Sequence, residues 1–571
     1  MTRRGRIWHT VLLTLVTGIL AVFLIYPIAL TIKGGFAEDV ATGEGFTFRH
    51  IIGIFRDPVL RGGLLNSLRV AATTTTIAIC LAFPLAIIAA RYRYPLKGLF
   101  NALILVPLIL PPFVGAIGAR AILGRAGALN ALAETEWDIL GTAKFWGVVV
   151  VQALSLYPII YLNATAALAN LDPALDEAAE NLGAGPWRRL FRITLPLIRP
   201  GIFAGATIVF IWSFTELGTP LMFDYYTVTP VHIFYGLKEV ENSATPYALT
   251  LVLLTMAVTM YVLGKLVFGG KAYAMYSKAS RASSERELGP RARWFATGAF
   301  ALVIGLAILP HMGVILTSLS WPGQWYQTIV PTVFTTQHYA TALTQQDSFG
   351  AIVNSIQYAS AAMAIDLGLG ILIAYLLVRT TAPGRGLLDA LTMLPLAVPG
   401  LVLAFGYVAM SQRWPMGKTG PLGDLVLGVD PNPVPLLIIA YAVRRLPYIV
   451  RSTVAGLQQT SGELEEAAIN LGASRITAVR KVIVPLIMAN LIAGALLVFS
   501  FSMLEVSDSL ILAQQSRHYP ITRAIFAFME RLGDGPYIAS AMGVWGMALL
   551  TVTLAGASVI LGKKLGSIFR V

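Results

Sequence analysis

Four acidic residues interrupt long apolar stretches of the sequence, where their carboxylates could gate a pathway, join helices or contact a solute. Glu216, in WSFTELGTP, and Glu505, in FSMLEVSDS, occupy equivalent places in two similar segments. A charge inside a membrane is costly and needs a partner or a function. We therefore expect this pair either to gate and hydrogen-bond helices or to bind substrate directly. Asp508 and Asp366 have no acidic counterpart, which fits either tuning of a pathway or sequence drift.

Two adjacent arginines, Arg444 and Arg445, lie well inside another apolar stretch. Such a pair is costly in a membrane unless it faces water or an acid. The pair predicts a cationic lining of a water-filled path, or a salt bridge to Asp366, Glu505 or Asp508. The alternative is that the span begins later than its apolar run suggests, which would leave both arginines at an interface.

No residue pattern predicts an enzyme active site or a metal centre. The six histidines are scattered, and the chain has no H-x-x-H, H-x-x-x-H or H-E-x-x-H motif. The single cysteine, Cys80, cannot form a thiolate cluster or an intramolecular disulfide, and its apolar surroundings predict a small buried hydrophobe. We therefore expect no catalytic residue, no metal and no cofactor.

A polar motif recurs between apolar stretches, as EAAENLGAGPWRRLFRITLP (177–196) and EAAINLGASRITAVRKVIVP (466–485). Each copy reads Glu-Ala-Ala, three residues, Gly, nine residues, then a short apolar step that ends in Pro. A chance repeat of five fixed positions is improbable, and small alanines beside a glutamate form a flat knob that fits a protein groove. The motif predicts two docking elements, made by Glu177, Ala178, Ala179, Gly183 and Pro196 and by Glu466, Ala467, Ala468, Gly472 and Pro485.

Local signals place each copy of the motif on a pair of short helices. In the first copy, Asp172 suits the N-cap and Pro173 suits the first helical position. In the second, Thr460 and Glu463 have the spacing of a capping box. The motif glycine can end each helix in the left-handed conformation, and a basic second helix should then lead back to the membrane at the motif proline.

The composition is that of a polytopic membrane protein. Of 571 residues, 56% are hydrophobic and only 12% are charged, and the mean hydropathy is +0.72. A soluble fold of this size needs more charge to cover its surface. Apolar runs long enough to cross a bilayer recur along the chain. We predict an all-α fold with 12 transmembrane helices, at about 9–32, 64–90, 100–122, 146–170, 200–222, 245–268, 294–318, 352–378, 388–411, 434–458, 489–512 and 540–562.

Charge placement predicts the orientation of these spans. The first apolar run is too long for a signal peptide and should remain as an uncleaved span. With both termini in the cytoplasm, cytoplasmic segments hold more than half of the 42 Lys and Arg residues and fewer than a third of the 29 acids. This is the expected orientation signal. The net charge of +13 is thereby explained by membrane topology, and nucleic-acid binding is not expected.

The two halves of the sequence align over most of their length. Arg91 matches Arg379 at an offset of 288, and Pro158 matches Pro447 at 289, so one residue was gained between them. Repeats with an even number of spans share one orientation, which predicts a pseudo-two-fold axis along the membrane normal. The expected domains are a first six-span half (1–268), a basic cytoplasmic linker (269–293) and a second six-span half (294–571).

The spacing E-A-A-x3-G-x9-I-x-L-P resembles the EAA motif of permease subunits of binding-protein-dependent ABC importers of the type I fold. The first copy matches throughout, whereas the second has Val482 and Val484 in place of the usual Ile and Leu. The resemblance covers essentially the whole chain, once per half. It implies the type I importer permease fold, with coupling helices around 177–183 and 466–472.

The resemblance also implies the partners. The chain has no G-x-x-x-x-G-K-[ST] phosphate loop, so it cannot supply the ATPase itself. Two copies of a cytoplasmic ABC ATPase, a periplasmic solute-binding protein and one fused permease chain would form the transporter in a bacterial inner membrane. Closure of the ATPase dimer would move the coupling helices together and rock the spans between outward-facing and inward-facing states.

The resemblance is least specific about which solute is transported. The fused layout and the phrase YAVRRLPYIVRSTVAGLQQTSGELEEAAINLGA resemble ferric-iron permeases, which favours ferric iron, free or as an anion complex. Import of thiamine, a phosphonate or a polyamine by the same machinery is the alternative. A secondary transporter would also show repeats and buried carboxylates, but it would not need paired docking knobs. A membrane enzyme would need a convergent catalytic set.

Overall fold

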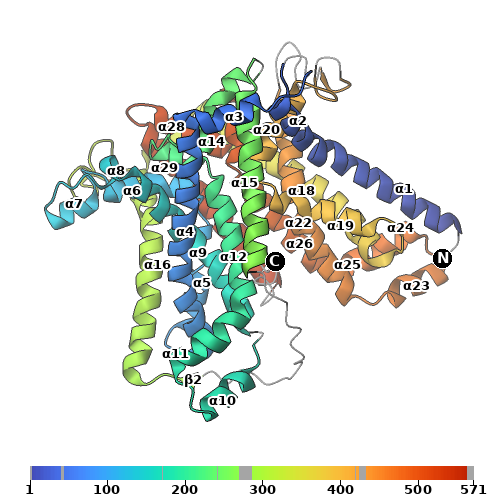
Figure 1. Ribbon diagram of the computed structural model, residues 1–571, viewed down its shortest axis with the longest axis horizontal. Coiled ribbons are helices and arrows are strands. Elements are labelled where there is room, and N and C mark those ends of the chain that lie inside the picture. Colours follow the sequence, from blue (N-terminus) through green and yellow to red (C-terminus); the bar gives the residue numbers. More distant parts are fainter. Residues whose placement is uncertain are drawn as a thin grey trace. The chain divides into compact units, whose positions relative to one another are not determined.

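The chain is helical almost throughout (Figure 1). The computed structural model describes residues 3–39, 44–169, 171–240, 242–268, 286–417, 420–423 and 432–561, and the predicted linker lies largely outside them. Strands β1 (Tyr92–Arg93) and β2 (Arg286–Glu287) form a short parallel pair. Apart from these two-residue strands, the elements of the described residues are helices, which agrees with the all-α expectation.

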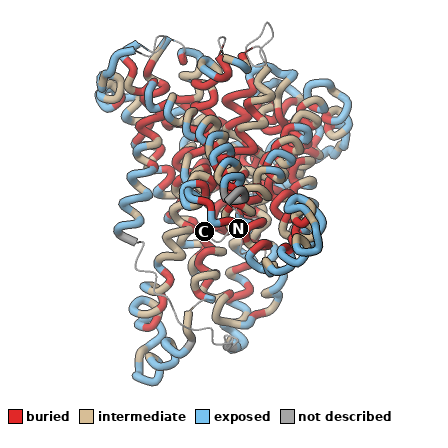
Figure 2. Tube along the Cα trace, turned by 90° about the vertical axis from the view of Figure 1, so that its right-hand side faces the viewer, coloured by how far each residue is buried: buried red, intermediate tan, exposed pale blue. Residues whose placement is uncertain are grey.

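The described residues form two compact units, and neither is a continuous half of the sequence. The 59–231 unit also contains residues 255–336, and the 337–561 unit also contains residues 3–58 and 232–254. In Figure 2 the long helices are red where they pack on other helices, and many connecting segments are pale blue.

The helices of the 59–231 unit include four long ones, of 20 to 34 residues, and several shorter ones. They are α4 (Pro58–Arg91), α5 (Lys97–Leu103), η2 (Val106–Leu108), α6 (Pro112–Leu123), α7 (Ala128–Ala133), α8 (Ile139–Thr142), α9 (Lys144–Ala169), α10 (Pro173–Asn181), α11 (Pro186–Arg189), η3 (Leu190–Thr194), α12 (Leu195–Phe214), α13 (Gly218–Met222) and α16 (Pro290–Leu319). Two further helices contribute residues to both units, α14 (Thr229–Gly236) and α15 (Thr245–Phe268).

The 337–561 unit contains the first helices of the chain together with most of the second half. Its helices are α1 (Arg3–Leu20), η1 (Ala21–Ile25), α2 (Tyr26–Phe36), α3 (Arg49–Arg56), η4 (Leu237–Glu239), α17 (Gln337–Thr344), α18 (Gln346–Arg379), α19 (Arg385–Ala397), α20 (Gly400–Ser411), α22 (Val434–Gln459), α23 (Glu463–Asn470), α24 (Arg475–Ala478), η5 (Val479–Ile483), α25 (Val484–Leu486), α26 (Met488–Met503), α27 (Ser507–Leu512), η6 (Ser516–His518), α28 (Ile521–Glu530) and α29 (Gly535–Leu561).

Each unit includes the first long helix of the opposite sequence half. In the 337–561 unit, α1 packs on α18 and α19, and α2 packs on α20. Leu13, Val16 and Leu20 of α1 are buried in one apolar core with Ile373 and Leu446. The exchange was not predicted, because an apolar run shows that a helix is buried in lipid or protein but not which neighbour it meets.

The reciprocal contact lies in the 59–231 unit, where α16 packs on α5, α6 and α9. Phe300 of α16 is fully buried and stacks on Tyr94 and Phe100, with ring centroids 4.9 and 5.7 Å away. Aromatic pairs at such distances add roughly 0.5–1.5 kcal/mol to the burial of their surface. The first helix of the second half is thus part of the core of the first.

The predicted count of 12 spans is only partly reproduced. Among the described residues, eight helices are long and apolar enough to cross a membrane, or up to eleven if each of three bent helix pairs is one span. The bends are 98° after Leu108, 105° after Ala397 and 78° after Leu486. The first two precede the N-caps Pro111 and Pro399, and proline disfavours a helical residue before it.

The remaining predicted span corresponds to α22, which is not among these candidates. It is a continuous helix that begins at Val434, but it carries Arg444, Arg445 and Arg451. Its buried side packs mainly on α18 and α26. The helix therefore exists as predicted, but its composition alone does not mark it as membrane-spanning.

Two details differ from the sequence expectations. The predicted spans 200–222 and 489–512 are interrupted, because α12 ends at Phe214 and α26 ends at Met503. Cys80 is exposed rather than buried, because it lies on the side of α4 that does not pack on other helices.

The contact between α6 and α16 depends on glycine. A Cβ atom on Gly118 would lie 1.9 Å from the carbonyl oxygen of Pro310, and one on Gly313 would lie 2.4 Å from the carbonyl oxygen of Gly118. Small residues that let helix backbones approach are a common basis of packing between membrane helices. These two glycines therefore set the distance between the two helices.

We predict that Gly118→Ala lowers the thermal unfolding midpoint of the purified protein in detergent, because the helices must separate. Overpacking of this kind costs about 1–3 kcal/mol. Gly305→Ala on α16 is the matched control, since nothing lies within 4 Å of its added Cβ. Equal midpoints for the two variants would show that the crossing tolerates the methyl group.

Candidate functional site

The two copies of the repeated motif adopt the same helix–turn geometry. In the first copy, Asp172 is the N-cap of α10, its side chain accepts the amide hydrogen bond of Ala174 at 3.0 Å, and Pro173 follows it. Gly183 has φ +80° and Gly472 has φ +92°. The predicted N-cap of the first copy and the left-handed ends of both helices are confirmed.

The hydrogen bonds at these helix ends match between the copies. The amide of Gly183 donates to the Glu180 carbonyl at 2.9 Å, and the amide of Ala184 donates to the Ala179 carbonyl at 2.9 Å. The corresponding bonds in the second copy run from Gly472 to Ile469 at 2.9 Å and from Ala473 to Ala468 at 3.1 Å. This pair of bonds is a Schellman motif, which satisfies carbonyls that the helix leaves open.

The predicted capping box of the second copy is wrong. Gly462 is the N-cap of α23, and its backbone precedes Glu463 without a side-chain cap. The Thr460 hydroxyl instead donates to the Gly456 carbonyl at 3.0 Å, at the C-terminal end of α22. Thr460 thus completes the preceding helix, and the amide of Glu463 donates to the Ser461 hydroxyl at 3.3 Å.

Each motif presents an exposed leucine that the sequence analysis did not single out. Leu182 is 88% exposed and Leu471 is 90% exposed, directly before the left-handed glycine of each copy. The glutamate and the first alanine of each motif are exposed too, and the second alanine is half-buried. The repeated phrase Asn-Leu-Gly was the available signal. Both copies of the motif therefore place an exposed apolar side chain at the same position.

Polar contacts attach each motif to a long helix. In the 59–231 unit, the side chain of Arg189 bridges Glu180 at 2.5 Å and Asp176 at 3.4 Å. Arg91, the last residue of α4, lies 3.7 Å from Asp176 and donates to the Thr194 hydroxyl at 2.5 Å. These contacts connect α10 to the end of α4.

The second motif is attached in a related way. Arg379, the last residue of α18 and the repeat partner of Arg91, donates to the carbonyls of Thr460 at 2.6 Å and Leu457 at 3.2 Å. Glu465 is buried and accepts the Tyr375 hydroxyl at 2.6 Å. The position of the motif is therefore coupled to α18.

Each motif proline lies at the start of a helix. Pro196 is the second residue of α12, and Pro485 is the second residue of α25.

Arg444, Arg445, Glu505 and Asp508 form one buried arginine–carboxylate cluster in the 337–561 unit. Arg444 donates to Glu505 at 2.6 Å and lies 3.5 Å from Asp508, and Arg445 pairs with the other oxygen of Glu505. Glu505 is 4% exposed and Asp508 is fully buried. The salt-bridge alternative for the arginine pair is the one that the structure shows, and α22 begins well before the pair.

Neighbouring groups support this cluster. Arg445 also donates to the Phe501 carbonyl at 3.2 Å, and its guanidinium carbon lies 5.6 Å from the centre of the Phe501 ring. A Cβ atom on Gly400 would lie 2.0 Å from the nearer guanidinium nitrogen of Arg444. Gly400, which sequence reasoning missed, therefore makes the space that Arg444 occupies.

Asp366 lies at the edge of the cluster but forms no ion pair within the part of the chain described. It is 1% exposed, and neither carboxylate oxygen has a hydrogen-bond partner there. Arg445 is the cation that acts on it electrostatically. One oxygen of Asp508 is likewise without a partner. The Nε of Arg445 is also buried without an acceptor in the described chain, so the hydrogen bonds of this region are incomplete on both the acid and the arginine side.

The equivalent region of the 59–231 unit has no arginine pair and uses neutral partners. Glu216 lies at the break between α12 and α13, where it accepts the amide of Thr219 at 2.8 Å and contacts the side-chain amide of Gln152 at 3.4 Å. Gln152 in turn accepts the Ser213 hydroxyl at 2.5 Å. The two symmetry-related glutamates therefore have different chemistry, one in a hydrogen-bond network and one in an ionic cluster.

Neither region gathers the ligands of a metal centre among its described residues. Across the described ranges, no three His, Cys, Asp or Glu side chains are placed to hold a metal ion. The arginines point at carboxylates, so their charge is matched inside the protein.

We predict that Glu505→Gln destabilises the protein far more than Glu216→Gln. Breaking a buried ion pair leaves an uncompensated charge and costs about 3–5 kcal/mol. The glutamine in Glu216→Gln still accepts the Thr219 amide, so its cost is about 1 kcal/mol. Unfolding in detergent followed by circular dichroism would measure both.

A variant without any charge in this region, Arg444→Met, Arg445→Met, Glu505→Leu and Asp508→Leu with Asp366→Asn, is the complementary test. Replacing a buried charged group by apolar residues is often nearly neutral. This variant should therefore be more stable than Glu505→Gln. A charge-free variant that is less stable than Glu505→Gln would argue against an uncompensated charge as the cause.

Known proteins resemble both halves of this chain. The family described as "Binding-protein-dependent transport system inner membrane component" matches residues 82–270 and 366–561. The chain is 25% identical to the ferric transport system permease protein FbpB of Actinobacillus pleuropneumoniae, with 93% of this chain and 75% of that protein covered. It is 25% identical to the Fe(3+)-transport system permease protein FbpB 2 of Haemophilus influenzae, with 99% of both covered.

A shorter relative aligns with one part of the chain. The molybdenum transport system permease protein ModB of Escherichia coli is 32% identical over 30% of this chain and 74% of its own length. The two family matches together cover more than half of the 571 residues, one in each half. The chain therefore belongs to the binding-protein-dependent transport system inner membrane components, as a multi-pass permease subunit of an ABC transporter that is not itself catalytic.

Proposed function

We propose that this chain forms the translocation pathway of an ATP-driven importer for ferric iron, with the solute delivered by a periplasmic binding protein. The observation that carries the proposal is the alignment of two ferric transport permeases with 93% and 99% of the chain. The molybdenum permease aligns with only 30%. Import of thiamine, a phosphonate or a polyamine by the same machinery is the alternative.

The helices α10 and α23 act as the coupling helices in this proposal. Each presents its exposed leucine, Leu182 or Leu471, to a groove on one of two cytoplasmic ATPase subunits. The contacts of Arg91 and Arg379 support this role, because they join the motif region to the ends of α4 and α18. Movement of the ATPase subunits would then be transmitted to the long helices, because these contacts hold the motif regions to them.

The membrane topology of the proposal has twelve spans and both termini in the cytoplasm of a bacterial cell. Eleven spans follow if each bent helix pair crosses once, and α22 is the twelfth. Its arginines favour a buried position, because Glu505 and Asp508 neutralise them inside the protein. The residues 1–268 and 294–571 would be the two permease halves, joined by the linker 269–293.

The buried charges serve as gating and helix-joining groups in this proposal. In the second half, the arginine–carboxylate cluster holds α22 to the break between α26 and α27. In the first half, Glu216 joins α12 and α13 to α9 through neutral hydrogen bonds. Direct contact of Glu216, Glu505, Asp508 or Asp366 with the solute is the alternative, and Asp366 favours it most because its oxygens are without partners in the described chain.

We predict that Leu182→Ser combined with Leu471→Ser uncouples the permease from its ATPase. Burying a leucine contributes about 1.5–3 kcal/mol, so losing either contact should weaken association roughly tenfold or more. Copurification of the ATPase and its permease-stimulated activity would both fall. Leu532→Ser is the matched control, because Leu532 is 94% exposed but lies outside both motifs. Equal losses in the control would refute the docking role.

We predict that vesicles containing this permease, its cognate ATPase and its binding protein take up ferric iron only when ATP is supplied. Radioactive iron retained in the vesicles would measure uptake. Collapse of ion gradients should leave uptake intact, which separates an ABC importer from a secondary transporter. Uptake of another solute but not iron would contradict the proposed substrate while keeping the proposed machinery.

A further inference from the structure

The second motif is attached to the first span of the chain as well as to α18. On α1, the Nε2 atom of His9 lies 2.9 Å from a guanidinium nitrogen of Arg475, the first residue of α24. Figure 1 shows the N-terminal end of α1 beside α24. A guanidinium only donates hydrogen bonds, so the imidazole nitrogen must accept this one. A residue at the start of the chain thus holds the segment that follows the turn of the second motif.

The surroundings of His9 fix the position of its ring. His9 is 6% exposed, and its ring packs edge-on against Tyr375 of α18, with ring centroids 6.4 Å apart. The Tyr375 hydroxyl donates to Glu465, the buried acid of α23. One network of contacts therefore joins α1, α18, α23 and α24.

Few charged groups act on this imidazole. Of the described charged residues, Arg475 and Glu465 are those that act on it electrostatically. The charged residues of α19, which also packs on α1, have other partners. Arg385 donates to backbone carbonyls at the end of α18, and Asp389 pairs with Arg451. The charge state of His9 is therefore decisive for its contact with Arg475.

The first motif has an internal anchor that the second cannot form. In the first, Arg189 pairs with Asp176 inside the same segment. At the offset of 289 that relates the motifs, Arg189 corresponds to Ala478. The same offset matches Arg475 with Pro186, which carries no charge. The second motif has thus lost the internal arginine and gained one that reaches α1.

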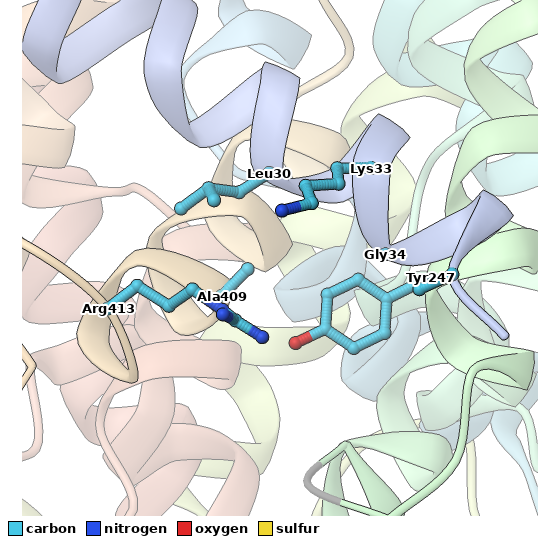
Figure 3. Close-up of a pocket in the computed structure, with 7 residues that line it drawn as sticks. Leu30, Lys33, Gly34, Tyr247, Ala409 and Arg413 are labelled. Atoms are coloured by element: carbon cyan, nitrogen blue, oxygen red, sulfur yellow. The ribbon is translucent and has the colours of Figure 1, made fainter. Parts of the chain in front are cut away.

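The span that carries His9 is fixed to the same unit at its other end, so it can support the motif. The Tyr407 hydroxyl of α20 donates to the Phe23 carbonyl at 2.7 Å. Figure 3 shows Gly34 of α2 beside the ring of Tyr247, and a Cβ atom on this glycine would lie 2.3 Å from that ring. Only glycine allows this approach, so α2 packs directly on α15.

We propose that His9 is a positioning residue for the second docking element and makes its attachment sensitive to cytoplasmic pH. The inference rests on the proposed docking role of the motif. Neutral imidazole accepts the hydrogen bond of Arg475, whereas imidazolium has no free acceptor and adds a second cation beside the guanidinium. Histidine changes its charge between about pH 5 and 8. The attachment is therefore present at the upper end of this range and is lost as the pH falls.

Hydrogen–deuterium exchange of the full-length permease in detergent tests the contact without the ATPase. His9→Leu removes the acceptor, whereas the side-chain carbonyl in His9→Gln can still accept from Arg475. We expect the backbone amides of 466–485 to exchange about two- to fivefold faster in His9→Leu, as for the loss of a partly exposed charged contact. His9→Gln should restore slow exchange, and the first motif, 177–196, should not change. Faster exchange in both motifs, or in neither, would overturn the positioning role.

Permease-stimulated ATP hydrolysis in vesicles, measured from about pH 8 to pH 6, tests the pH sensitivity. The rate of the natural protein, divided by that of His9→Gln at the same pH, should fall about two- to fivefold as the pH falls, because glutamine does not titrate. His50→Gln makes the same change on α3 and should keep the natural pH profile. A constant ratio would overturn the pH sensitivity.

The leucine variants separate this inference from the function on which it rests. Loss of stimulated hydrolysis in Leu182→Ser with Leu471→Ser, but not in His9→Leu, would overturn the role of His9 and keep the docking role. Full stimulation in the leucine variant would overturn the docking role itself. The exchange experiment would then still report whether His9 holds the segment.

Discussion

The structure depends on one constraint: inside a hydrocarbon layer, every charge and every open backbone group must find its partner within the protein. The two helix breaks after Phe214 and Met503 show how the chain meets it. At the first, the Glu216 carboxylate accepts the amide of Thr219. At the second, the Glu505 carbonyl accepts hydroxyls of Ser509 and Thr522 at 2.5 and 2.6 Å. The helices could therefore end within the packed helices without exposing polar backbone.

The motif regions match between the two halves, but the buried residues around the matched glutamates do not. The motif helices, their left-handed glycines and the arginines that anchor them recur in both halves. The surroundings of the matched glutamates have diverged together: where the second half has Arg444 and the glycine that makes room for it, the first has Ser155 and Pro112. The arginine and the glycine that leaves space for it therefore occur together in the second half, and neither occurs at the matched position of the first.

Helix caps and left-handed turns could be predicted from the sequence, whereas contacts between residues far apart in the chain could not. Asp172, Gly183 and Gly472 behave as their residue types and spacing require. The capping box failed because Thr460 had a competing partner in the preceding helix, which a motif of four residues does not reveal. The acids and arginines were recognised as candidates for pairing, yet only the structure selects Glu505 as the acid that both arginines share. Gly400 carried no signal because its function is to leave space.

The exchange of first helices has a consequence for how the protein is made. The side chains of α1 that enter the core of the 337–561 unit meet partners on α18 and α22, more than 300 residues later in the chain. A ribosome adds about 5–20 residues per second, so α1 waits on the order of half a minute before those partners exist. During that time lipid, or another protein of the insertion machinery, must shelter its apolar face. Helix α1 is thus made well before the neighbours that it finally packs against.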